Sequence, residues 1–381
     1  MPSVLYYVQN LWGLGHDRRA AAITRAMIDI GWGVTYVSGG FSDSSHGLRG
    51  AQHVSLPPIK SGTPEQGGLI GERGSAPDTN YWNRRRHSLM ETFESAAPDL
   101  LLIETFPFGR WPFRRELEPL LDAARNKCAI VCSVRDILEP KAEDRRNRQI
   151  IDLIERYFDL VLVHGDDEFI RLDRTFSLAS KIAGKTRYTG YVSAAAVARS
   201  SSETDGRGEV IVSAGGGATC TPLMRAAMDA AMKDGRTWRF LLGPSCPTAV
   251  HEFLKNKPNV LVESIRLDFP GLLGRADASI SQAGYNTTMD VVTCEVPAVM
   301  VPYQGMGQVE QNLRAARLAE VGRVALVPEA DVSGGTLLAA LKQAEYGQIQ
   351  LTAELKTNGA EKSADILANL LKTRFSIQEQ I

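Results

Sequence analysis

Apolar and polar residues alternate along the first half of the chain in a pattern that predicts strands and helices in turn. Residues 4–9 form an apolar run typical of a buried strand, and apolar residues at Ala20, Ile23 and Met27 then recur at helical spacing. Further strands are predicted over 34–38, 100–103, 129–134 and 160–164, and helices over 16–30, 81–96, 116–126 and 143–158. Such alternation predicts an α/β fold in which helices cover both faces of a parallel sheet.

A second alternating series begins near residue 209. Strands are predicted over 209–213, 238–243, 260–262, 278–281, 297–302 and 324–327, and helices over 222–233, 248–256 and 362–375. Small and polar residues over 191–208 predict a linker between the two series. We therefore expect two Rossmann-like domains that face each other across a cleft. Their predicted bounds are 1–192 and 193–360, and a terminal segment over 361–381 is expected to cross back to the first domain.

One segment of the first half does not fit the alternation. Residues 42–79 are rich in Gly, Pro and Ser and show little periodicity apart from a short predicted strand near 53–56. Loops of this length in compact domains are usually functional or mobile. We interpret the segment as a flap beside an active site.

Composition narrows the class of protein. The 381 residues are 44% hydrophobic and 23% charged, so a sizeable core and two domains are expected. The 43 basic and 44 acidic residues give a formal net charge of −1, which argues against a nucleic-acid partner. Five cysteines without a CxxC pair favour reduced thiols over a disulfide framework or a zinc site. No apolar run is long enough for a transmembrane helix, so a cytoplasmic location is expected.

Glycine turns follow the first strand of each series. Gly13 and Gly15 precede His16, which is placed at a helix start on the carboxyl edge of the sheet. The dinucleotide fingerprint is incomplete there, because its third glycine is missing. An unperturbed pKa of ~6.5 would suit His16 to act as a general base, although it could instead cap the helix. In the second series, Gly215, Gly216 and Gly217 form either an anion-binding nest or only a tight turn.

The segment 281–290 has the pattern of a phosphate site. A predicted strand ends in a turn at Gly284, and a helix then opens on Asn286 and Thr287. Free N–H groups and the helix dipole favour an anion at such a helix start. Asp290, one turn further, is placed to bind a hydroxyl pair. Glu310 and Gln311 follow the next strand and can bind further hydroxyls. Together these residues indicate a site for a nucleotide-sugar.

Other strand ends in the first half carry weaker candidates. Residues 104–110 could form a wall of an acceptor pocket, with Glu104 or Arg110 facing it, or an ordinary turn with aromatic packing. Arg135 with Asp136, and His164 with Asp166, also end strands. Asp166, Asp167 and Glu168 are the one tight acidic cluster, which a helix N-terminus explains as well as a cation does. No metal site is expected.

The motifs at 281–290 and 301–311 resemble the donor signature of the family 28 glycosyltransferases in order and nearly in spacing. Residues 13–19 and 106–110 look more like an uncharacterised bacterial branch of predicted glycosyltransferases. The resemblance implies the two-domain GT-B fold, with an acceptor-binding first domain and a nucleotide-sugar-binding second domain. It implies donor contacts from Gly215, Gly216, Gly217, Ser264, Ile265, Arg266, Gly284, Asn286, Thr287, Asp290, Glu310 and Gln311. Asp290 would hold the ribose, Glu310 and Gln311 the sugar, and 264–266 the base through backbone groups.

For the acceptor side we expect contacts from Gly15, Glu104, Phe106, Arg110 and Arg135. The resemblance implies an inverting transfer without a metal cofactor, in which His16 deprotonates an acceptor hydroxyl. The co-substrate would be a UDP-sugar, with UDP-N-acetylglucosamine the expected type. The acceptor would be a small molecule, a glycan or a lipid-linked molecule, with at most peripheral membrane association. Two alternatives remain: a UDP-sugar 2-epimerase or hydrolase of the same fold, and a non-catalytic subunit that binds nucleotide-sugars.

Overall fold

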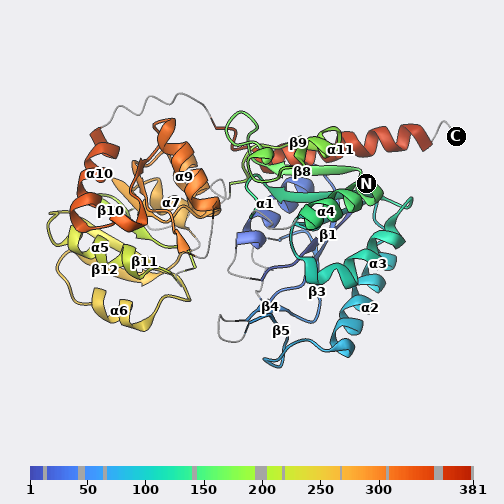
Figure 1. The fold of residues 1–381 in the computed structure, drawn as a ribbon, viewed down its shortest axis with the longest axis horizontal. Coiled ribbons are helices and arrows are strands. Elements are labelled where there is room, and N and C mark those ends of the chain that lie inside the picture. Colours follow the sequence, from blue (N-terminus) through green and yellow to red (C-terminus); the bar gives the residue numbers. More distant parts are fainter. Residues whose placement is uncertain are drawn as a thin grey trace. The chain divides into compact units, whose positions relative to one another are not determined.

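The computed structural model describes residues 1–11, 15–41, 48–62, 67–139, 144–193, 204–216, 219–266, 268–305, 309–346 and 355–378. The chain divides into two compact units. Unit 1 comprises Met1–Val192 together with Asn358–Ile381, and unit 2 comprises Ser193–Thr357. Figure 1 shows the helices and strands of both units.

Unit 1 is built on a seven-stranded sheet in the order β3-β2-β1-β6-β7-β8-β9. Every neighbouring pair in this sheet is parallel. Its strands are β1 (Ser3–Val8), β2 (Gly33–Ser38), β3 (Gln52–Ser55), β6 (Leu100–Glu104), β7 (Ala129–Arg135), β8 (Leu160–His164) and β9 (Thr186–Tyr188). The central strands read as continuous apolar runs because helices cover both faces of the sheet.

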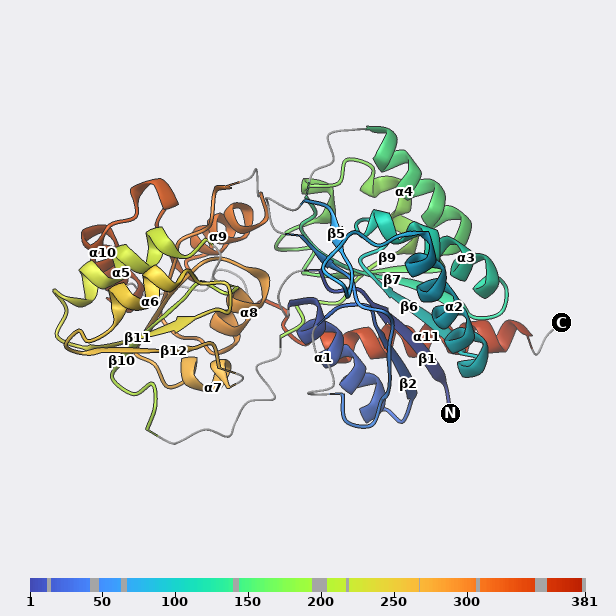
Figure 2. The same cartoon turned by 90° about the horizontal axis from the view of Figure 1, so that it is seen from below.

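The helices of unit 1 cover two apolar cores, one on each face of the sheet. They are α1 (Gly15–Asp29), α2 (Thr79–Ala96), α3 (Arg114–Ala124), α4 (Asp144–Tyr157) and α11 (Gly359–Gln378), with 3₁₀ turns η1 (Trp111–Phe113), η2 (Leu172–Arg174) and η3 (Ala179–Lys185). One core packs α2, α3 and α4 against the sheet. The other holds Ile23 and Met27 of α1 and Leu367 and Leu371 of α11. The chain's last helix therefore lies beside its first, as Figure 2 shows.

The start of α2 illustrates how the sequence fixes a helix boundary. Asp78 accepts a hydrogen bond from the backbone N–H of Tyr81 at 2.7 Å, which satisfies one of the free donors of the first turn. The helix then buries Trp82, Leu89 and Phe93 on one face. Burial of each such side chain contributes about 1.5–3 kcal/mol, so this face holds α2 on the sheet.

Unit 2 repeats the same construction with six strands in the order β12-β11-β10-β13-β14-β15, again in parallel pairs. Its strands are β10 (Glu209–Ser213), β11 (Thr237–Leu242), β12 (Val260–Ser264), β13 (Ala278–Ser281), β14 (Ala298–Met300) and β15 (Ala325–Leu326). Its helices are α5 (Thr221–Ala231), α6 (Thr248–Leu254), α7 (Phe269–Leu273), α8 (Tyr285–Thr293), α9 (Glu310–Glu320) and α10 (Gly334–Tyr346), with the 3₁₀ turn η6 (Glu329–Asp331).

The expected α/β alternation and parallel sheets are present in both units. The short strand predicted near 53–56 in the flap segment is present as β3, which extends the sheet. The antiparallel hairpin of β4 (Lys60–Ser61) and β5 (Leu69–Ile70) was not predicted. Residues 42–47 and 63–66 of the flap, and 194–203 of the expected linker, lie outside the described residues. Within the described ranges, no helix is long and apolar enough to cross a membrane.

Candidate active site

Polar side chains gather where the central strands of unit 1 end. Parallel strands place their carboxyl ends at one edge of a sheet. At this edge β1 leads through a loop into α1. Gly15 opens α1 and His16 follows in its first turn. Residues 12–14, which include Gly13, lie outside the described residues. The expected position of His16 at a helix start is therefore observed.

Glu104, the last residue of β6, is the centre of this group. Its side chain is fully buried. The Tyr6 hydroxyl donates to its Oε2 at 3.1 Å, and the Ser133 hydroxyl donates to the same oxygen at 2.6 Å. Its Oε1 lies 3.0 Å from His16 Nδ1 and also forms an ion pair with Arg19. Four side chains from β1, β7 and α1 thus converge on one buried carboxylate.

A second histidine extends the network. Ser133 Oγ lies 2.8 Å from His164 Nε2, and His164 Nδ1 lies 3.0 Å from Thr189 Oγ1. Because Ser133 donates its single proton to Glu104, the proton between Ser133 and His164 belongs to His164 Nε2. His164 is fully buried, and burial lowers its pKa to about 3. The uncharged His164 side chain therefore contacts Ser133 and is linked to Glu104 through it.

The charges around Glu104 keep it ionised. Burial acts to raise the pKa of Glu104, but Arg19 and the hydrogen bond from His16 outweigh it and hold that pKa well below its usual range. Burial lowers the pKa of His16 to about 3; its hydrogen bond to Glu104 opposes this shift, while Arg110, Arg19 and Arg135 add to it. The expectation of an unperturbed His16 pKa is therefore wrong, because this imidazole is desolvated among three arginines.

Two contacts bear on the tautomer of His16, because Nδ1 lies 3.0 Å from Glu104 Oε1, which only accepts, and 3.1 Å from Arg19 Nη2, which only donates. We assign the proton of the neutral imidazole to Nδ1, since Arg19 already donates to the ionised Glu104 and Glu104 accepts from Nδ1–H as well. The lone pair then lies on Nε2, which makes no hydrogen bond with any residue of the described ranges. The side chain retains an exposed fraction of 13%. His16 can thus accept a proton from a group that approaches it, while Glu104 holds the tautomer.

The side chains expected to bind an acceptor divide into two groups. Arg110 and Arg135 are half-buried, and Arg110 donates from Nε to the carbonyl of Gln9 at 2.7 Å. Burial lowers the pKa of Arg110 to about 10. Phe106 is fully buried and stacks near Trp111, with ring centroids 6.3 Å apart. Phe106 and Glu104 therefore have no surface with which to touch an acceptor in this conformation.

In unit 2 the loops after β10 and β11 lie against each other. Gly215 has a φ of +53°, a conformation that favours glycine. A Cβ on Gly243 would lie 2.2 Å from the carbonyl oxygen of Gly215, so only glycine allows this backbone approach. Ser245 N–H donates to the carbonyl of Gly216 at 3.1 Å. Gly216 itself is exposed, while Gly217 lies outside the described residues.

The loop after β13 leads into α8. Gly284 is the N-cap of this helix and supplies no side-chain cap, and Asn286 and Thr287 in the first turn are half-buried. The first-turn N–H groups of a helix have no partner within it, so they can bind an anion. Gln282 Nε2 donates to the carbonyl of Thr219 at 3.1 Å, which ties this loop to the loop after β10.

The position expected to hold the ribose is buried, and two of the positions expected to line the base already have partners within unit 2. Asp290 lies on α8 and is only 2% exposed. The N–H of Ile265 already donates to the carbonyl of Leu242 at 3.0 Å, which removes it as a donor to a base. Arg266 forms ion pairs with Asp268 and Asp205, both at 2.7 Å. Ser264, the last residue of β12, is exposed.

Glu310 and Gln311 open α9 as half-buried residues. Glu310 Oε1 accepts from the fully buried Arg314 at 3.0 Å, and the Arg314 guanidinium lies 5.1 Å from the ring centroid of Tyr285 on α8. Gln311 Oε1 accepts from the N–H of Tyr303 at 3.1 Å. These contacts bring the start of α9 beside α8.

The sequence interpretation missed three residues of the unit 1 network: Arg19, Tyr6 and Ser133. Arg19 lies three residues after His16 on the same helix, and this spacing could have identified it. Tyr6 and Ser133 lie within apolar strands, where the sequence gives no signal of a polar role. The weaker candidate Asp136 accepts from the Tyr191 hydroxyl at 2.8 Å and is buried. Among the described residues, no group of His, Cys, Asp and Glu could hold a metal ion.

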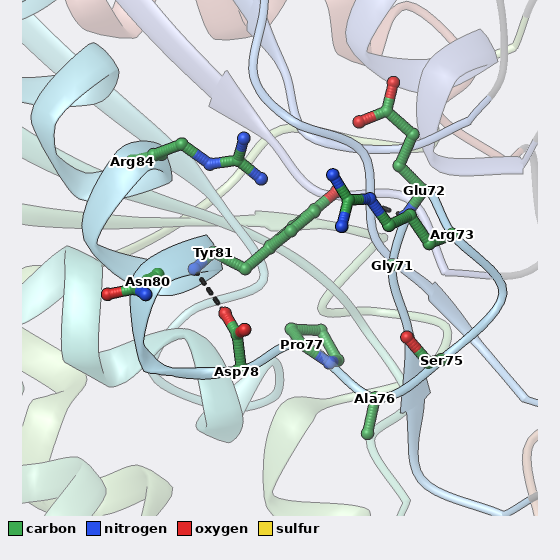
Figure 3. Close-up of a pocket in the computed structure, with 10 residues that line it drawn as sticks. All are labelled: Gly71, Glu72, Arg73, Ser75, Ala76, Pro77, Asp78, Asn80, Tyr81 and Arg84. Atoms are coloured by element: carbon green, nitrogen blue, oxygen red, sulfur yellow. Dashed lines mark hydrogen bonds between the residues drawn. The ribbon is translucent and has the colours of Figure 1, made fainter.

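The flap carries a pocket of its own. A volume of about 330 Å³ is enclosed by the loop over 71–78 and by Asn80, Tyr81 and Arg84 at the start of α2. Figure 3 shows this arrangement and the hydrogen bond from Tyr81 N to Asp78. The pocket contains none of the expected site residues, so the flap lines a separate hollow.

The comparisons with known proteins agree with this architecture. Two solved structures cover nearly the whole chain: CalG4, the calicheamicin glycosyltransferase, has a TM-score of 0.62 at 15% identity over 100% of this chain and 98% of that one. MurG of Acinetobacter baumannii has a TM-score of 0.59 at 15% identity over 97% and 100%. The chain therefore has the GT-B fold of glycosyltransferases.

Residues 210–370 match the model of the glycosyltransferase family 28 C-terminal domain. The UDP-N-acetylglucosamine–N-acetylmuramyl-(pentapeptide) pyrophosphoryl-undecaprenol N-acetylglucosamine transferase of Exiguobacterium sp. (strain ATCC BAA-1283 / AT1b) is 28% identical over 124 residues, which is 32% of this chain and 35% of that protein. Its namesake in Synechococcus sp. (strain CC9605) is 26% identical over 178 residues, 46% and 47% of the two chains. The chain thus spans about a third to a half of the length of these relatives. Residues 210–370 thus resemble the C-terminal domain of the family 28 glycosyltransferases.

Proposed function

We propose that the chain is an inverting, metal-independent glycosyltransferase that moves a sugar from a UDP-sugar to an acceptor hydroxyl. The observation that carries the proposal is the His16–Glu104 pair in a chain whose residues 210–370 match the family 28 C-terminal domain. The curated relatives are named for transfer from UDP-N-acetylglucosamine, which supports that donor type here.

In this proposal His16 Nε2 takes the proton of the acceptor hydroxyl as its oxygen attacks the anomeric carbon. Glu104 accepts from Nδ1–H and stabilises the imidazolium as it forms. The low pKa of His16 keeps the imidazole neutral near pH 7 but makes it a weak base, so the proposal requires the bound substrates to raise this pKa. We therefore assign Glu104 to positioning the base and Phe106 to core packing. Arg110, Arg135 and Gly15 remain the proposed acceptor contacts.

Unit 2 would hold the donor through backbone groups. The first turn of α8 at Gly284, Asn286 and Thr287 and the turn at Gly215 and Gly216 would bind the diphosphate, which gains one negative charge as it leaves. Glu310 and Gln311 would contact the sugar. Ser264 and the carbonyl groups of 264–266 would lie along the base.

Asp290 stays in the proposal as the ribose anchor, although its burial requires α8 to open slightly when the donor binds. Replacing Asp290 by Ala should then weaken UDP binding by about 1–3 kcal/mol, the cost of a lost charged hydrogen bond. Calorimetric titration with UDP measures this directly. An unchanged affinity would assign Asp290 to the core of unit 2 instead.

A nucleotide screen followed by turnover tests the function. Thermal shift with nucleoside diphosphates and their sugars should give a selective response to UDP and a UDP-sugar, because a ligand stabilises the state that binds it. UDP release from UDP-N-acetylglucosamine should then require an acceptor from a panel of small-molecule, glycan and lipid-linked alcohols. Rapid formation of epimer or free sugar without acceptor would support the epimerase or hydrolase alternative. Donor binding without turnover under any condition would support the non-catalytic subunit.

A further inference from the structure

Two cysteines of unit 2 are in direct contact at the edge of the sheet. Cys220 is the N-cap residue of α5, and Cys246 lies in the loop between β11 and α6. Both thiols are free, and their sulfur atoms are 2.9 Å apart. A relative movement of under about 1 Å would bring them to the S–S bond length of ~2.05 Å.

One thiol of the pair can be reached from solvent. Cys220 is fully buried, whereas Cys246 is half-buried and is flanked by the exposed Ser245 and Pro247. Burial, together with the nearby Cys246, raises the pKa of Cys220 to about 12. Cys246 is therefore the thiol that an oxidant meets first, and Cys220 is placed behind it to complete a bond.

The pair joins loops that the proposed donor site uses. Cys246 N–H donates to the carbonyl of Gly243 at 3.0 Å, and Gly243 packs directly on the backbone of Gly215 and Gly216. On the other side, Cys220 follows Thr219, whose carbonyl is held by Gln282. A covalent bond between the two sulfurs would thus draw the loop after β11 and the start of α5 together.

We propose that Cys220 and Cys246 form a reversible disulfide that weakens donor binding in unit 2. The cross-link itself stands on the geometry of the two thiols, and its effect on the donor rests on the proposed function. When the two sulfurs approach each other, Cys220 and the adjacent Thr219 move relative to Gln282. Backbone N–H groups that bind an anion must be held within about 0.5 Å of their working positions, so this shift lowers affinity.

The oxidant is a small-molecule disulfide such as oxidised glutathione. The Cys246 thiolate attacks one sulfur of that disulfide and releases one thiolate, which leaves a mixed disulfide on Cys246. Cys220 then attacks Sγ of Cys246, and its proton passes to the second small thiolate as that thiolate leaves. In sum, two protein thiols and one small disulfide give one protein disulfide and two small thiols.

The test uses the full chain equilibrated in glutathione buffers of increasing oxidising strength. Peptide mapping without reductant should show one peptide pair that joins Cys220 to Cys246, and the free thiols should fall from five to three. The dissociation constant for UDP, measured by calorimetry, should rise about tenfold in the oxidised protein, which is less than the about 10²-fold in rate that a 1 Å misplacement can cost. Dithiothreitol should restore both values.

The half-buried Cys246→Ser variant should bind UDP as the reduced protein does and lose the response to oxidant. Cys294→Ser is the matched control, since Cys294 is also half-buried, in the same unit, and donates only to the carbonyl of Pro270. It should respond like the wild type. Five free thiols after full oxidation, or an unchanged UDP affinity in the cross-linked protein, would overturn the proposal. A disulfide in a protein that binds no UDP in either state would confirm the cross-link and overturn the donor site.

Discussion

The two units share one architecture and differ in what they place at the carboxyl ends of their strands. In unit 1 this edge holds a buried carboxylate, Glu104, with His16, Arg19 and Ser133 bonded to it. In unit 2 the corresponding edge is formed by backbone at Gly215, Gly216 and Gly284, and by the contact of two thiols.

In the proposed function, this difference lets one topology serve two tasks. Proton transfer needs a titratable group whose state is fixed by burial and by neighbouring charges, and the proposal assigns that group to unit 1. Binding a diphosphate needs N–H dipoles at a close backbone approach, which small residues permit and large side chains prevent. The predictions below separate chemistry in unit 1 from binding in unit 2.

The largest effect is expected from His16→Ala. Removal of the proposed general base should lower kcat by about 10²–10⁴-fold, because the acceptor hydroxyl loses its proton acceptor. UDP affinity should stay unchanged, since the donor groups lie in unit 2. His87→Ala is the control, as His87 is 75% exposed on α2 and pairs only with Glu91. Full turnover in the His16 variant would remove His16 from the mechanism.

Glu104→Gln should destabilise unit 1 by about 3–5 kcal/mol, because the buried Arg19 loses its ionised partner. It should also lower kcat more than it raises KM, because the imidazole loses the acceptor that fixes its tautomer. Pulse-labelled hydrogen exchange of β6 and β10 in rising urea reads the two units separately. Glu118→Gln, which breaks the exposed pair with Arg114, should change stability by less than about 1 kcal/mol. Equal effects of the two variants would refute the role assigned to Glu104.

Acid should weaken unit 1 before unit 2. The pKa values of His16 and His164 are lowered from 6.5 to about 3, so below pH 6.5 the unfolded state binds protons that the folded state does not. Stability is therefore present above pH 6.5 and is lost as the pH falls from 6.5 toward 3, at up to about 1.4 kcal/mol per pH unit for each histidine. The same exchange experiment at pH 6.5 and pH 5 should show lost protection in β6. The His164→Gln variant should lose less protection in β6 at pH 5. An equal loss of protection in β10 would contradict the assignment of the acid sensitivity to unit 1.

The smallest effect is expected at Gly243. A Cβ there would meet the backbone of Gly215 and Gly216, so Gly243→Ala should push the two loops apart and weaken UDP binding by about 1–3 kcal/mol. Gly235→Ala is the control, because a Cβ at Gly235 meets nothing within 4 Å. Turnover at saturating UDP-sugar should fall less than affinity does. If both variants bind UDP with equal affinity, the contact between the two loops makes no contribution to donor binding.

Much of the fold could be predicted because its signals are local. The apolar run over 4–9 and the helical spacing of Ala20, Ile23 and Met27 depend only on neighbours along the chain, and they match β1 and α1 within a few residues. The hairpin of β4 and β5 escaped prediction because each strand has only two residues, too few for a period to show.

The candidate site was predictable only in part. His16 and Glu104 were identified separately, because each follows a strand, but nothing in the sequence linked them across 88 residues. Glu104 was expected to face an acceptor, and the structure instead turns it inward to hold His16. The contact of Cys220 with Cys246 was likewise invisible, since 26 residues separate them and no motif joins them.

The sequence by itself determined the two alternating α/β series, the glycine turns and the helix starts, because backbone propensity and hydrophobic period act over a few residues. Only the tertiary structure decided the protonation state of His16 and the partners of Glu104. These depend on burial and on charges that four separate elements bring within 3 Å or so of one another, and such distances are set by packing of the whole sheet.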